Sequence, residues 1–426
     1  MAATWARFEI KLETPSESRW LTQLIRSTSN SVDRGVYGPL FPLAEWIVEN
    51  WWFLLHESCR VPEFANGRSL ANDPNQREWV RRHNLLGARE GGALPDLTIY
   101  RDGNAVMMKW EPDPYFDERI RPVRFIEEGL ASIEPTEVER ELHRLVDSVL
   151  ERLTDKTDDS VQQLRTNWNA IGESRQNEST LCALAASMGL DPYNENELTD
   201  ELIEVINSRV CGLPVKIRHD LADVTNGESL VAELDWLDRA LPKDAPSATR
   251  ADEDLTTRHA SAHQTGYEKA AQVRQTYSLP LTPLTDLKTL LHDHCGWSVP
   301  EKQFEIVEGT KRISSLVTTR DNRPLVVGPT LPPQTDRFRL ARSLYFFSDN
   351  GCEFSPRLVT RAFNWDQRVS RAFAAELLAP AEALRSRIDN IVGAEEVEQL
   401  GREFGVDPKL IEHQIKNHRL AWIDEE

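Results

Sequence analysis

The chain has 426 residues and a formal net charge of −19, with 40% hydrophobic and 28% charged residues. This length predicts about two to four domains, and the acidic balance argues against bulk electrostatic capture of nucleic acid. The five cysteines are widely spread and form no CxxC pair, so they indicate neither a disulfide framework nor a zinc knuckle. The N-terminus has no apolar signal core and no run reaches membrane length, which predicts a cytoplasmic protein without a membrane span.

Residues 1–126 are predicted to form an N-terminal α+β unit. Residues 6–12 alternate like a strand. Residues 37–57 are dense in aromatic side chains and predict a buried helix, with a ligand or partner groove as the alternative. Asp102 and Gly103 between two apolar runs predict a β-hairpin, and residues 123–126 a further strand.

Residues 127–265 read as a helical region followed by a linker. Apolar spacing predicts helices over 134–153, 179–189 and 197–210, and a capping box at Thr136 for the first. The last two helices resemble a helix–turn–helix DNA reader, but acidic residues crowd the second of them, which favours structural packing. The polar, proline-containing segment 243–258 predicts a linker or a long exposed loop.

Residues 266–426 are predicted to form a C-terminal domain of helices and a small sheet. A helix over 284–291 precedes strands at 305–307, 313–318 and 325–328. Two helices follow, within 336–347 and 368–378, and the tail predicts a helix pair around Gly405. The whole chain is therefore expected to be α+β and mainly helical.

The two helices between Asp336 and Pro380 carry a motif framework. The first contains Arg-Phe-x-Leu-Ala at residues 337–341, and the second contains Phe-Ala-Ala-x-Leu-Leu-x-Pro at residues 373–380. This pair resembles the ImmA/IrrE family of metallopeptidase-like proteins, and the order of helix, strands and motif helix resembles it too. The resemblance covers about the last third of the chain and implies a zincin-like fold there.

The metal-binding motif of that family is degenerate in this chain. Its HExxH window falls on residues 342–346, and its third ligand falls on Val369. Two histidines four residues apart hold zinc from one helix face, and the intervening glutamate is the general base. Here those positions hold Arg342, Ser343 and Phe346. We therefore expect a pseudo-peptidase domain with no metal, no cofactor and no catalytic residues.

Arg342 has two interpretations. It either points into the emptied pocket and pairs with a carboxylate such as Glu376 or Glu382, or lies at the surface. Several further arginines make the region locally basic, which indicates a solvated face or a contact with nucleotide, phosphate or nucleic acid. They are Arg337, Arg339, Arg357, Arg361, Arg368 and Arg371. The residues expected to contact a pocket or partner are Arg342, Glu376, Arg337 and Arg371.

Other ligand-like patterns are weaker. His292, His294 and Cys295 cluster, but a spacing of two does not place both histidines on one helix face. His259 and His263 have helical spacing without a glutamate between them, so coincidence is favoured.

Three functions follow. The first is a non-catalytic regulator or sensor that binds a protein or a ligand; the resemblance implies a bacterial stress-response, mobile-element, toxin–antitoxin or phage-defence context. The second is an enzyme whose site lies in the N-terminal region, where His56, Glu57, His83 and Asp96 are candidates, or at an atypical metal site. The third is a transcriptional regulator that reads DNA through polar residues of the C-terminal helix pair, namely Lys409, His413, Gln414, Lys416, Asn417, His418 and Arg419.

Overall fold

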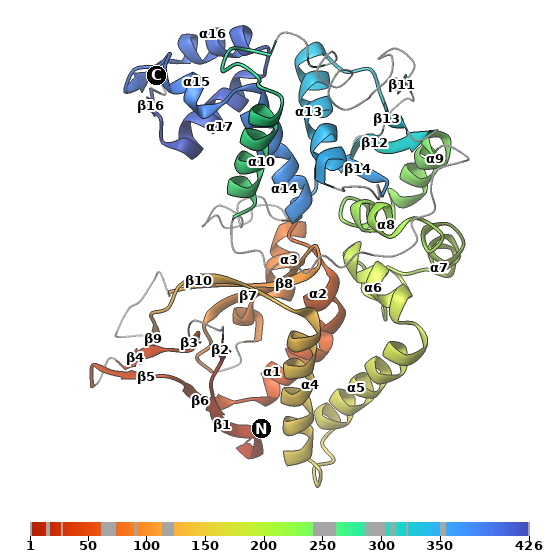
Figure 1. The fold of residues 1–426 in the computed structure, drawn as a ribbon. Helices are drawn as coiled ribbons and strands as arrows, with labels where there is room; N and C mark the ends of the chain where they lie inside the picture. Colours follow the sequence, from red (N-terminus) through yellow and green to blue (C-terminus); the bar gives the residue numbers. More distant parts are fainter. Residues whose placement is uncertain are drawn as a thin grey trace. The chain divides into compact units, whose positions relative to one another are not determined.

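A computed structural model describes residues 2–13, 18–26, 29–60, 74–88, 92–112, 123–241, 261–284, 287, 304–306, 310, 312–320, 323–349 and 355–424. The chain is α+β, with many helices and several small sheets (Figure 1). It divides into two compact units, Met1–Ile203 and Glu204–Glu426. This boundary lies inside the region that the sequence assigned to one helical domain over residues 127–265. The helices before it pack with the N-terminal unit, whereas those after it pack with the C-terminal sheet.

The first unit combines short strands with two groups of helices (Figure 1). Its elements are η1 Ala2–Thr4, β1 Trp5–Phe8, β2 Lys11–Glu13, β3 Ser18–Trp20, β4 Leu24–Arg26, β5 Ser31–Asp33, β6 Val36–Pro39, α1 Phe41–Glu49, α2 Trp51–His56, α3 Pro74–His83, η3 Leu85–Ala88, β7 Asp96–Asp102, β8 Ala105–Glu111, β9 Val123–Phe125, β10 Gly129–Ile133, α4 Pro135–Arg152, α5 Asp159–Asn177 and α6 Ser179–Ser187; α7 Asp200–Val205 begins in it.

The aromatic helix predicted over residues 37–57 is two helices. Residues 36–39 form strand β6 instead. Helix α1 ends at Glu49, before Asn50, whose backbone leaves the helical region with φ −111° and whose side-chain amide donates to Trp46 O at 2.8 Å. Both helices are buried as predicted: Trp51 and Leu54 are fully enclosed in the core of this unit. The predicted hairpin is confirmed, because β7 and β8 pair antiparallel around Gly103, which has φ +60°.

Two local predictions need correction. The single strand expected over residues 6–12 is broken into β1 and β2, which pair with β6 and β3 respectively. The capping box expected at Thr136 is not formed, because α4 begins one residue after Glu134 with Pro135 at its first position. Proline has no backbone N–H to satisfy there, so the helix starts without a side-chain cap.

The second unit places helices around a four-stranded sheet. Its elements are a π-helical turn Ile206–Val210, α8 Val215–Ala222, α9 Leu230–Ala240, α10 Ala262–Thr276, β11 Phe304–Ile306, β12 Ile313–Arg320, β13 Arg323–Gly328, α13 Pro333–Asp349, β14 Arg357–Thr360, α14 Trp365–Leu378, α15 Ala381–Arg385, β15 Ile391–Val392, α16 Ala394–Phe404, α17 Pro408–His418 and β16 Trp422–Ile423. The sheet order is β11-β13-β12-β14, and the sequence did not predict β14.

Helices α10 and α14 pack very closely along one another (Figure 1). Their contact is possible because Gly266 faces α14: a Cβ atom at this position would lie 2.6 Å from Val369 O and 2.7 Å from Phe373 N. Ala262 and Ala270, one turn before and after it, are also buried. The helix pair predicted around Gly405 is present, and Gly405 ends α16 with φ +64°.

Several predictions fall outside the described residues. These are the linker over 243–258, most of the helix over 284–291, the cluster of His292, His294 and Cys295, and His259. Within the part of the chain that the structure describes, no helix is both long enough and apolar enough to cross a bilayer.

Candidate functional site

The two residues that the sequence analysis aligned with metal-binding histidines face the same part of the interior. Arg342 and Phe346 lie four residues apart on α13, and both are buried. The Arg342 guanidinium donates to Ser370 Oγ at 3.0 Å, to Thr360 O at 3.0 Å and to Gln367 Oε1 at 2.5 Å. Arg357 from β14 lies over the Phe346 ring, 4.8 Å from its centroid. Cations and an aromatic ring therefore fill the interior between α13, β14 and α14.

Gln367 links the two sides of this interior. Its Oε1 accepts from Arg342 and from Thr360 N, and its Nε2 donates to Leu358 O at 2.6 Å and to Asp220 Oδ1 at 3.2 Å. Both donors meet the oxygen and both acceptors meet the nitrogen, so one orientation of the amide satisfies all four contacts. Asn364 positions the residue by capping α14 through a bond from Gln367 N at 2.9 Å.

Asp220 on α8 supplies the negative charge of the cluster. Its two oxygens accept from Arg357 Nε at 2.8 Å and from the second Arg357 nitrogen at 3.0 Å, which is a bidentate pair. The same carboxylate accepts from Leu358 N at 3.0 Å and from Gln367, so four donors surround it. Arg357 also contacts Asp366 at 2.8 Å. We call Asp220, Arg342, Arg357, Asp366 and Gln367 the buried polar cluster.

The electrostatics of the two arginines differ. For Arg357, burial opposes the charge, but Asp220 and Asp366 outweigh it and raise the pKa above its ordinary value. For Arg342, burial and the nearby Arg371 lower the pKa well below its ordinary value, and Asp220 compensates only in part. Arg342 contacts no carboxylate among the described residues; its three acceptors are neutral oxygens.

The remaining motif positions have no group for metal chemistry. Ser343 donates to Arg339 O at 2.9 Å inside α13, and Val369 is fully buried in the core. No group of three histidine, cysteine, aspartate or glutamate side chains in the described ranges is arranged to hold a metal ion.

The predicted pairing of Arg342 with Glu376 or Glu382 is not what the structure shows. Glu376 accepts from Ala381 N at 3.1 Å and Gln414 at 2.7 Å, and lies 3.2 Å from His418. Glu382 is exposed on α15. Arg342 points instead to the start of α14, because Ser370 and Gln367 offer oxygens there.

The arginine-rich region is only partly a surface. Arg337 donates to Leu284 O, and Arg339 donates to Pro329 O and Asp336. The guanidinium groups of these two arginines, like those of Arg342 and Arg357, make hydrogen bonds inside the second unit. Three arginines remain toward solvent around the start of α14: Arg361 is exposed, and Arg368 and Arg371 are half-buried. The basic face predicted from the sequence is thus smaller than its arginine count suggests.

The predicted DNA-reading face of the C-terminal helix pair is partly turned inward. Gln414 is buried against Glu376, and Asn417 donates to Tyr267 Oη at 3.2 Å. The rings of His418 and Tyr267 lie 4.3 Å apart. Lys409, His413, Lys416 and Arg419 remain exposed, so fewer side chains than predicted are available to base edges.

Of the four polar residues suggested for a site in the first unit, two meet. Glu57 Oε2 lies 3.1 Å from His83 Nε2, and His83 Nδ1 lies 2.6 Å from Ile99 O. Burial opposes ionisation of Glu57, yet His83, Arg82 and Arg60 hold its pKa below the ordinary value. Both side chains are fully enclosed, so this pair ties elements together rather than facing a substrate. Asp96 bonds Asn84 elsewhere, and His56 stacks on Trp52.

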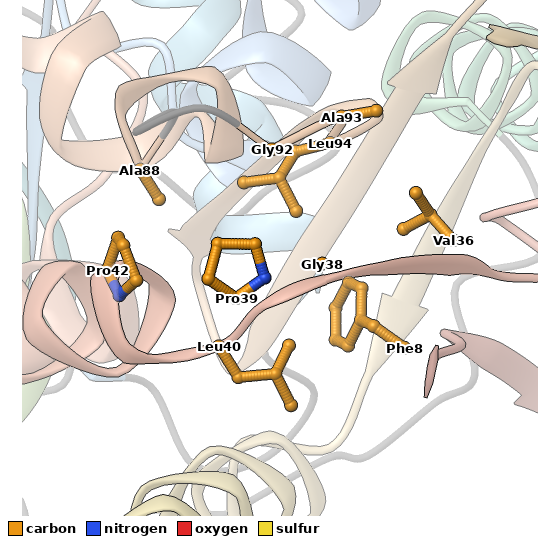
Figure 2. Close-up of a pocket in the computed structure, with 10 residues that line it drawn as sticks. All are labelled: Phe8, Val36, Gly38, Pro39, Leu40, Pro42, Ala88, Gly92, Ala93 and Leu94. Atoms are coloured by element: carbon orange, nitrogen blue, oxygen red, sulfur yellow. The ribbon is translucent and has the colours of Figure 1, made fainter. Parts of the chain in front are cut away.

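Two hollows of this unit are also poor sites. Figure 2 shows the first, a cavity of about 20 Å³ enclosed by apolar groups that include Phe8, Gly38 and Leu94. It has room for about one water molecule and offers no polar side chain. The second is an open groove of about 640 Å³ along α4, where His143 pairs with Asp147 at 2.9 Å and the arginines pair with neighbouring glutamates.

Comparison with protein-family models gives no match for the chain, and a search of curated proteins gives none. The buried polar cluster is therefore interpreted from its geometry alone. Sequence reasoning placed Arg342 there but missed Asp220 and Gln367. A signal for Asp220 exists: it lies on the same face of α8 as Ile217 and Leu221, and an acid within an apolar stripe calls for a buried partner.

Proposed function

We propose that the chain is a non-catalytic regulator or sensor that acts by binding a partner. In this proposal the second unit is a peptidase-like scaffold of the ImmA/IrrE kind whose metal site is filled by side chains. By that resemblance, the proposed role lies in bacterial stress response, mobile-element control, toxin–antitoxin function or phage defence, with a protein as the expected partner.

One observation supports the proposal: Arg342, which the resemblance aligns with the first zinc-binding histidine, is buried and hydrogen-bonded. A fixed guanidinium repels a metal cation, and it has no lone pair to donate. Phe346 lies four residues further along α13, and its ring stacks with Arg357 and offers no metal ligand. The polar groups around them are paired with each other, so the interior needs no ion to satisfy them.

Elemental mass spectrometry of the purified full-length protein tests this, together with thermal melting with and without a chelator. We expect less than stoichiometric zinc, no shift of the melting temperature and no cleavage of an unfolded protein substrate. An R342M variant serves as a matched comparison, because it removes the charge and keeps the length. Stoichiometric zinc, or a chelator-sensitive proteolysis by the wild type, would overturn the proposal.

The partner side of the proposal needs a separate measurement. A tagged full-length chain is isolated from its own host, the co-purifying protein is identified by mass spectrometry, and both are purified and recombined. A defined complex of the two purified proteins supports a binding role. If the purified proteins do not associate and the chain converts a substrate, the enzyme alternative replaces it.

A further inference from the structure

The start of α14 presents arginines and aromatic rings in alternation. Residues 361–371 read RAFNWDQRVSR. The guanidinium of Arg371 lies 5.4 Å from the Phe363 ring centroid, and that of Arg368 lies 6.0 Å from the Trp365 ring centroid. Both rings are half-buried. Arg371 also donates to Ala362 O at 2.7 Å, which fixes the loop between β14 and α14 against the helix.

The positive charge of this surface lies close to that of the buried Arg342. Arg342 contacts Ser370, the residue that precedes Arg371. Burial and the charge of Arg368 lower the pKa of Arg371 to about 10, and Arg371 in turn acts on Arg342. Like charges held this close favour an anion between or above them. Among the described residues, two carboxylates of this region are engaged with other groups: Asp366 contacts Arg357, and Asp223 accepts from Asn364 at 2.5 Å.

We propose that Arg361, Phe363, Trp365, Arg368 and Arg371 form a binding surface for a nucleotide unit, a phosphate joined to an aromatic base. The arginines would meet the phosphate, and a guanidinium lying over an aromatic ring offers the flat cationic surface on which a base stacks. This surface fits a single strand or a free nucleotide better than a duplex, because stacking needs an unpaired base. The inference rests on the proposed function, in which this scaffold binds rather than cleaves.

The test uses the full-length protein and a fluorescently labelled single-stranded oligothymidylate at low salt. We expect saturable binding that weakens as salt is added. Arg361 is exposed with no described contact, so R361E should leave the fold intact and weaken binding about tenfold, with a shallower salt dependence by about 0.7 in log–log slope. R385E, an exposed arginine on α15, is the matched control and should bind as the wild type does.

Competition separates the sources of the ligand. If adenosine monophosphate displaces the oligonucleotide at concentrations where inorganic phosphate does not, a free nucleotide is the natural ligand class. If only unlabelled oligonucleotide competes, the ligand is a strand. F363A should weaken either form, since it removes the stacking surface but no charge.

Three results would overturn the inference: no binding by the wild type at low salt, equal binding by R361E and R385E, or displacement by oligoglutamate as effective as by oligothymidylate. The last would identify a generic anion patch. Measuring zinc in the same preparation distinguishes failure of this inference from failure of the proposed function. A protein that contains zinc and still binds the oligonucleotide refutes the filled metal site but not the nucleotide-binding surface.

Discussion

Removal of Asp220 should destabilise the junction of α8, β14 and α14 far more than its single charge suggests. Its carboxylate is 1% exposed and accepts four bonds from Arg357, Leu358 and Gln367. Among the described residues, D220A leaves the buried Arg357 guanidinium with Asp366 and the Phe346 ring as partners, and removes the acceptor of Leu358 N and of one of the two Gln367 Nε2 bonds. Breaking a buried pair from one side costs about 3–5 kcal/mol, a large part of the stability of a typical domain.

Hydrogen exchange at the Leu358 amide is the most direct assay, since this amide donates to Asp220 itself. A loss of about 3 kcal/mol accelerates exchange by at least about a hundredfold. Local exchange is preferable to a global melt because the chain has two compact units and need not unfold in one step. D238A is the matched control: Asp238 pairs with Arg209 at 2.6 Å on the surface, where such a pair contributes about 0–1 kcal/mol. Equal exchange rates at Leu358 in D220A and D238A would refute the reasoning.

Four smaller predictions follow from local geometry. G266L should lower the melting temperature of the chain, because the larger side chain forces α10 away from α14. G38A, measured in the same way, should stabilise the first unit by about 0.5–1 kcal/mol, because its new methyl group meets no atom within 4 Å. Cys182 should react slowly with iodoacetamide at pH 8, followed by mass spectrometry, because burial raises its pKa to about 11. In denaturant titrations, the free energy of unfolding of the first unit should decrease as pH falls through the lowered pKa of Glu57, and the decrease is complete only below that pKa. E57Q should make the free energy of unfolding less dependent on pH in this range.

Local signals in the sequence determined what could be predicted. The β7–β8 hairpin depends on a two-residue turn at Gly103, and the pair α16 and α17 on Gly405, so each prediction needed only neighbouring residues. The break at Asn50 was missed, because a bond from a side-chain amide to the local backbone is not visible in an apolar pattern. The pairing of β14 was missed for another reason: its partner strand β12 is distant in sequence, so the pairing is set by tertiary contacts.

The candidate site was predicted only in part, for the same reason. The motif framework located Arg342 and Phe346, which lie on one face of α13 as their spacing requires. Their partners were not predictable, because Asp220 lies 137 residues before Arg357 in the chain. A carboxylate was expected beside Arg342, with Glu376 and Glu382 as the candidates. The carboxylate that acts on Arg342 comes from α8, through the amide of Gln367.

The hydrogen bonds of the buried polar cluster show why an arginine suits position 342, whether or not the proposed resemblance holds. Without a donor at residue 342, Thr360 O and Gln367 Oε1 would each lose a hydrogen bond in the buried interior, which is costly. Arg342 supplies that donor, and its charge then needs a distant anion, which Asp220 supplies. Asp220 on α8 and Arg342 on α13 are therefore coupled through their charges and through the amide of Gln367. A substitution that removes the charge of Arg342 should loosen α8, although the two residues share no direct hydrogen bond.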